Sequence, residues 1–97
     1  MPEPAKVKEE KKEEGINRTT VTIFDHEYVL KGTETPEYMR ALAAYVDRKM
    51  RQVGEKNPHY PPVKIAVLAA LNIADELNKI RQDYETLIRL IQEERKG

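Results

Sequence analysis

The sequence predicts an α+β fold: a small head made of a β-hairpin and a packed helix, followed by a long C-terminal coiled-coil helix. Three observations lead to this prediction. Residues with high strand propensity follow a period-two pattern after Arg18, and a helix-start signal stands at Thr35–Glu37. The segment from Val63 to Lys96 contains neither Gly nor Pro. A period of two residues is typical of strands, and steps of three and four residues are typical of helices.

Three regions are expected along the 97 residues. Residues 1–17 are predicted to be a disordered tail, because they are dense in Lys and Glu and carry almost nothing that could be buried. Residues 18–62 form the head, and residues 63–97 form the long helix, which docks on the head at its start and then forms a stalk. About 80 residues remain for folding, a size at which a monomeric core is marginal, so self-association is expected.

The hairpin is predicted from a period-two pattern. Val21 and Ile23 fall on one side of the first strand, and Phe24 falls on the other. A tight turn is expected at Asp25–His26, since both residue types tolerate left-handed backbone, and the second strand at Glu27–Lys31. A lone two-stranded ribbon is not stable in water, so it has to pack on another element or gain strands from a partner.

The first helix has a clear start signal. Thr35 supplies a hydroxyl cap, Pro36 suits the first helical position, and Glu37 places an acid in the positive first turn. The helix is expected to end at about Val53, before Gly54. An apolar stripe that would cover the hairpin runs along it, formed by Met39, Leu42, Ala43, Val46, Met50 and Val53.

The long helix is predicted to need other chains. It would extend over roughly 34 residues, about 50 Å, which exceeds the width of an 80-residue globule. Its apolar residues step by four and three, as in the seam of a coiled coil, and Ile88 and Leu90 widen the stripe towards a four-helix arrangement. The heptads leave parallel and antiparallel arrangements open. The predicted oligomer interface consists of Ile73, Leu77, Ile80, Tyr84, Leu87, Ile88, Leu90 and Ile91.

Composition argues against catalysis and against several partner classes. The chain has no Cys and no Ser, and its two histidines, His26 and His59, lack a partner at metal-ligand spacing. No enzyme, cofactor or metal is therefore expected. A net charge of zero makes nucleic acid an unfavourable partner, and the longest apolar run, Ile65–Leu71, is too short to span a membrane. A cytoplasmic protein is expected.

Three segments together resemble the ZapA family of bacterial cell-division proteins. They are Val21–Tyr28, Leu42–Met50 and Lys64–Leu77, in the order hairpin, helix, long helix. The resemblance extends from about Thr19 to Glu94, and its most specific part is Ala70-Leu71-Asn72-Ile73-Ala74-Asp75-Glu76-Leu77.

The resemblance implies a function for the whole assembly. Members of the family form dimers that join tail to tail into an antiparallel homotetramer, and each head end binds FtsZ, the tubulin-like GTPase of the division ring. The chain would then crosslink or bundle FtsZ filaments at mid-cell and stabilise the ring. The alternative from the residues alone is a coiled-coil adaptor for another cytoplasmic partner.

The resemblance also suggests residues for FtsZ contact. His26 stands at a hairpin position that is often basic or polar in the family, and Asp25 stands where many relatives place glycine. Val63, Lys64 and Leu68 match positions near the filament-facing surface of the family, and the alternative for Val63 and Leu68 is a role in packing the head. These four residues, His26, Val63, Lys64 and Leu68, are the candidate FtsZ-binding set.

Overall fold

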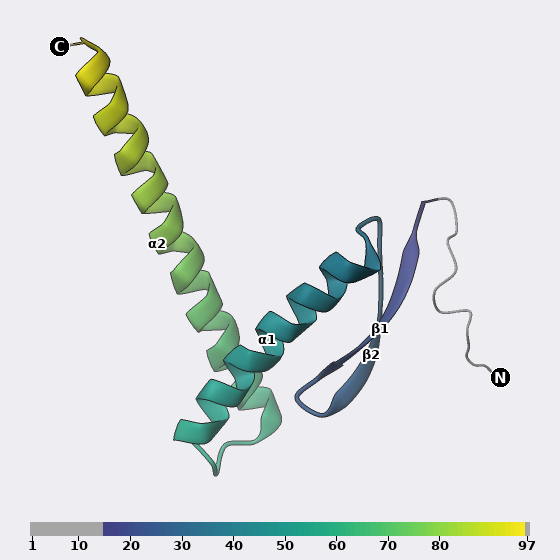
Figure 1. The fold of residues 1–97 in the computed structure, drawn as a ribbon. Coiled ribbons are helices and arrows are strands. Elements are labelled where there is room, and N and C mark those ends of the chain that lie inside the picture. The colour runs from purple at the N-terminus through teal and green to yellow at the C-terminus, as the bar shows by residue number, and fades with distance from the viewer. Residues whose placement is uncertain (1–14, 97) are drawn as a thin grey trace. The chain divides into compact units, whose positions relative to one another are not determined.

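The computed structural model describes residues 15–96. It contains a hairpin, β1 (Asn17–Ile23) and β2 (His26–Gly32), followed by α1 (Pro36–Lys56) and α2 (Pro62–Lys96) (Figure 1). The predicted α+β class and the order hairpin, helix, long helix are confirmed. Of the tail predicted at residues 1–17, residues 1–14 lie outside the described residues.

The described residues fall into two compact units, and the division along the chain lies between His59 and Tyr60. The first unit holds the hairpin and α1, and the second holds α2.

The hairpin is antiparallel and in register from Asn17 opposite Gly32 to Ile23 opposite His26. Burial alternates along β1, with Asn17, Thr19 and Val21 buried and Thr20 and Thr22 exposed. The helix α1 packs against β1. The predicted alternation of the first strand is therefore confirmed, although the strand begins at Asn17, one residue before the expected Arg18.

The core of the first unit lies between β1 and α1. Four of the six predicted stripe residues are buried there, whereas Val46 is half-buried and Leu42 is exposed. Gly32 contributes by leaving space, because a Cβ there would lie 2.7 Å from Cε of Met39. The buried side chains of this core are Thr19, Val21, Met39, Ala43, Met50 and Val53.

The start of α1 confirms the predicted signal, whereas its end does not. The Thr35 hydroxyl accepts the Tyr38 N–H at 3.1 Å, and Pro36 opens the helix. The helix continues through Gly54 to Lys56, so the expected end at Val53 is wrong. Asn57 explains the extension, since its backbone N–H and side-chain amide donate to carbonyls of the last turn.

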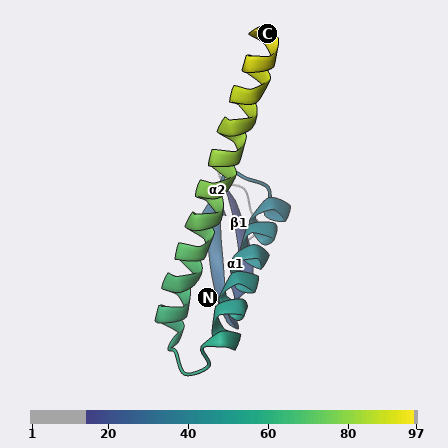
Figure 2. The ribbon, with the colours of Figure 1, turned by 90° about the vertical axis from the view of Figure 1, so that its left-hand side faces the viewer.

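The second unit is built on α2, one unbroken helix of 35 residues (Figure 2). It begins at Pro62, one residue earlier than predicted, and the Ile65 N–H donates to the Pro61 carbonyl at 3.1 Å. Ile65 and Ala69 are buried, while most side chains beyond them are exposed in a single chain. No described helix is long and apolar enough to cross a membrane.

Candidate functional site

The hairpin turn consists of Phe24 and Asp25, and both have a left-handed backbone. Their φ angles are 51° and 69°, which is the pattern of a two-residue type I′ turn. The turn expected at Asp25–His26 is therefore displaced by one residue, and Phe24 is not a strand residue. Aromatic residues rarely adopt a left-handed backbone conformation, so other contacts have to hold Phe24 in it.

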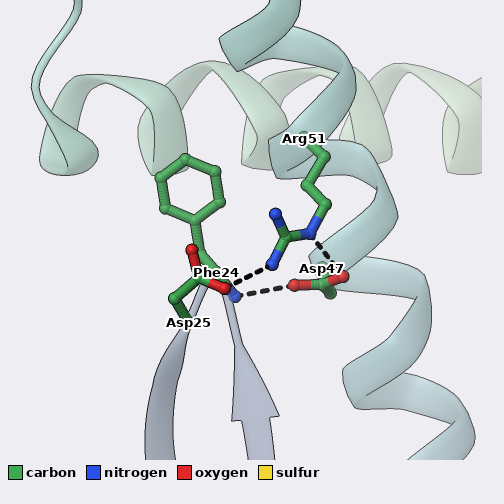
Figure 3. A network of polar contacts seen from close by, with 4 residues as sticks. All are labelled: Phe24, Asp25, Asp47 and Arg51. Carbon is green, nitrogen blue, oxygen red and sulfur yellow. Dashed lines mark hydrogen bonds and ion pairs between the residues drawn. The ribbon is translucent and has the colours of Figure 1, made fainter.

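Two side chains of α1 hold the turn from outside the hairpin. The Phe24 N–H donates to Oδ1 of Asp47 at 2.7 Å, and Nε of Arg51 donates to Oδ2 of the same carboxylate at 3.0 Å. Arg51 also reaches Asp25, with Nη2 at 2.9 Å from Oδ1 (Figure 3). The Arg51 guanidinium lies 5.7 Å from the centre of the Phe24 ring. We refer to Phe24, Asp25, Asp47 and Arg51 as the turn clamp.

The charges of the turn clamp support one another. The hydrogen bond from the Phe24 N–H, followed by the contact with Arg51, lowers the pKa of the Asp47 carboxyl from its ordinary 3.8. Hydrogen bonds to Asp47 and then to Asp25 raise the pKa of the Arg51 guanidinium. Both groups are therefore held in their charged forms, and the clamp is an ionic contact between a turn and a helix.

His26 is the first residue of β2 and is exposed. It pairs with Ile23 and directly follows the turn that the clamp contacts. His59 is exposed as well. Among residues 15–96 no group of three His, Cys, Asp or Glu side chains could hold a metal ion.

The other three candidate contact residues lie at the start of α2. Val63 is 76% exposed and Leu68 is half-buried. Lys64 is exposed, with its ammonium 4.1 Å from the centre of the Tyr60 ring, a cation–π contact that orients the side chain. His26 belongs to the first compact unit, and these three residues belong to the second. The four candidate residues therefore fall into two groups, one in each unit.

The predicted oligomer interface is an exposed apolar stripe in the single chain. Ile80 and Tyr84 are 63% and 64% exposed, and Leu77, Leu87, Leu90 and Ile91 are exposed to a similar degree. Ile73 and Ile88 are half-buried. A stripe of this length on one helix resembles an interface for other helices more than an ordinary surface.

No sequence pattern predicted the turn clamp. Asp47 and Arg51 stand four residues apart, which is the spacing of a helix ion pair, and that was the only local signal. Their partners in the turn are 23 and 26 positions away, a distance that no local pattern reports.

Comparisons with known proteins give consistent matches over most of the chain. A family model described as "Cell division protein ZapA" matches residues 19–96. The "Cell division protein ZapA" of Geobacillus thermodenitrificans (strain NG80-2) is 39% identical over 85 residues, covering 88% of this chain and 93% of the relative. That of Bacillus pumilus (strain SAFR-032) is 42% identical over 73 residues, covering 75% of this chain and 86% of the relative.

A solved structure is similar in fold to most of this chain. It is the "ZapA mutant dimer from Geobacillus stearothermophilus", with a TM-score of 0.63 and 35% sequence identity, covering 84% of this chain and 95% of that chain.

Proposed function

The chain belongs to the ZapA family of cell division proteins, and on this premise we propose that it is a non-enzymatic protein that binds FtsZ and bundles its filaments. Membership of this family gives the chain a role in cell division. The resemblance of the sequence to that family implies FtsZ as the partner. Binding to the division ring would put the chain in the cytoplasm at mid-cell.

The exposed stripe of α2 is the observation that carries the crosslinking part of the proposal. Leu77, Ile80 and Tyr84 are about half exposed or more in one chain, and other helices of the same kind would bury them. A homodimer, joined tail to tail into a homotetramer, would carry binding heads at both ends. Multivalency would then convert weak head contacts into strong attachment.

Dimer formation has support from a related structure. The solved relative from Geobacillus stearothermophilus is named as a dimer. At 35% identity over most of both chains, we extend the dimer to this protein as part of the proposal.

The proposed FtsZ contact includes His26, Val63, Lys64 and Leu68. His26 is exposed next to a turn whose backbone the clamp holds, and Val63 and Lys64 are exposed at the first turn of α2. Accessibility is a property that a contact residue needs, and a backbone already held in place lowers the ordering cost of binding.

Sedimentation of FtsZ with GTP tests the proposal. Adding this protein at a stoichiometric amount is expected to increase the pelleted, bundled polymer, and FtsZ with GDP serves as the control. No increase would overturn FtsZ bundling and favour the coiled-coil adaptor for another partner. Light scattering over a concentration series gives the mass, and a dimer at every concentration would overturn the tetrameric crosslinker.

A further inference from the structure

The strand β2 has one open edge. In residues 15–96 the sheet has two strands, so β2 pairs with β1 on one side and has no strand on the other. The helix α1 packs against β1, and Tyr28 and Val29 of β2 are 49% and 54% exposed. An open edge with exposed apolar side chains is a template for pairing with another strand.

The register of the hairpin determines which backbone groups reach this edge. Ile23 and His26 flank the two-residue turn, so they form the hydrogen-bonded pair that closes it. Hydrogen-bonded and non-hydrogen-bonded pairs alternate in an antiparallel ladder. Glu27, Val29 and Lys31 therefore direct their N–H and C=O groups away from β1 and towards the open edge.

These three outward residues are self-complementary. We propose that β2 pairs in antiparallel fashion with β2 of a second copy of this chain, with Val29 opposite Val29 of the partner subunit. Glu27 then stands opposite Lys31 of the partner subunit, and the symmetry repeats this ion pair on the other side. A single surface facing itself about a two-fold axis is the usual arrangement of a homodimer.

Charge selects this register over its neighbours. Shifting the pairing by two residues puts Val29 opposite a charged residue and removes both ion pairs. Shifting it by four residues puts Glu27 opposite Glu27, or Lys31 opposite Lys31, of the partner subunit, and like charges directly opposite are destabilising. In the register centred on Val29, Glu27 and Lys31 each stand opposite a residue of opposite charge.

The pairing would also enlarge the sheet. Two hairpins joined through β2 form a four-stranded sheet, which adds to the support that the hairpin already receives from α1. The inference rests on the proposed homodimer and adds the surface through which the heads meet.

A cysteine crosslink tests the pairing directly. The chain has no Cys, and Cα atoms of a hydrogen-bonded antiparallel pair lie about 5.5 Å apart, a separation that suits a disulfide. Val29→Cys in the full chain is expected to give a disulfide-linked dimer on mild oxidation. Thr20→Cys is the matched control, since Thr20 is exposed opposite Val29 on β1 and would remain unlinked.

The outcomes separate this inference from the proposed homodimer. If Val29→Cys stays unlinked while light scattering gives a dimeric or tetrameric mass, the β2 pairing is overturned and the homodimer stands. A monomeric mass at all concentrations would overturn both.

A charge exchange tests the register. Glu27→Lys or Lys31→Glu alone is expected to weaken the dimer on the order of tenfold, because each puts like charges opposite at two symmetric places. The double exchange is expected to restore the wild-type dissociation constant, measured by sedimentation over a dilution series. Glu55→Lys on α1 is the control for net charge. A double exchange as weak as the single variants would overturn the register.

Discussion

The carboxylate of Asp47 accepts the backbone N–H of Phe24 at 2.7 Å, across 23 positions of sequence. This bond joins the middle of α1 to the tip of the hairpin. Two-residue turns of this type usually contain Asn and Gly, which adopt left-handed backbone at little cost. Here an acid on a helix supports a turn whose own residues are less suited to it.

Removing the clamp should loosen the turn. Asp47→Ala deletes the acceptor of the Phe24 N–H and the partner of Arg51. We expect the Phe24 amide to exchange faster with solvent and the thermal midpoint to fall. Glu55→Ala, at an exposed acid of the same helix, is the control and should change neither.

Glycine in the turn should rescue the loss. Asp25 has a φ of 69°, a conformation that Gly adopts without steric cost. Adding Asp25→Gly to Asp47→Ala is expected to recover part of the thermal midpoint. If the combined variant is less stable than Asp47→Ala alone, holding the left-handed turn is not the role of the clamp.

The contribution of Asp47 should disappear in acid. Its pKa in the folded protein lies below the ordinary 3.8, because Phe24 and Arg51 favour the charged form. A lowered folded pKa adds stability above the unfolded pKa, and this stability is lost as the pH falls through the folded pKa. The urea midpoints of wild type and Asp47→Asn should therefore differ at about pH 6 and converge towards about pH 2. Midpoints that stay equally far apart would contradict an ionic clamp.

Thr19→Val should stabilise the protein. Thr19 is fully buried, and its hydroxyl has no hydrogen-bond partner among the described residues. Replacing an unpaired buried hydroxyl by a methyl group removes a desolvation cost of about 1 kcal/mol. The free energy of unfolding measures the gain, and Thr20→Val on the exposed face should change it little. A loss of stability in Thr19→Val would mean that the hydroxyl is satisfied in solution.

Ile80→Asp should split the assembly. Ile80 lies in the predicted seam and is 63% exposed in one chain. In an oligomer the change would remove a buried aliphatic side chain worth about 2 kcal/mol and add the cost of burying a charge. Light scattering measures the mass. Gln82→Asp, two residues away and outside the seam, should leave it unchanged, and an unchanged mass in Ile80→Asp would show that the seam is misassigned.

His26→Asp should weaken FtsZ binding without changing the oligomer. The residue is exposed at the start of β2, directly after the turn. If the turn faces the filament, an acid there should reduce the FtsZ that co-sediments at a fixed protein concentration. Full-strength binding with an unchanged mass would remove His26 from the proposed contact.

The fold was largely predictable because its signals are local. The start of α1 is specified by the adjacent Thr35 and Pro36, and the strand and helix periods come from neighbouring residues. The family resemblance at Ala70–Leu77 is likewise confirmed by the family model. The predicted position of the turn was wrong because Asp47, which lies on α1, supports Phe24 in the left-handed backbone region. The predicted end of α1 was wrong because Asn57 caps the last turn beyond Gly54.

Because α2 is unbroken, a change in its length also changes the direction in which its apolar stripe faces. Its 35 residues contain no internal Gly or Pro, so the helix has no built-in hinge. Each inserted residue would lengthen it by about 1.5 Å and turn everything beyond it by about 100°. Adding seven residues would extend it by about 10 Å and keep the stripe nearly aligned, whereas adding five would turn the two ends against each other. If the stripe is to remain one surface, the span between the ends of α2 can therefore change only by insertions that complete nearly whole turns, such as about seven or about eleven residues.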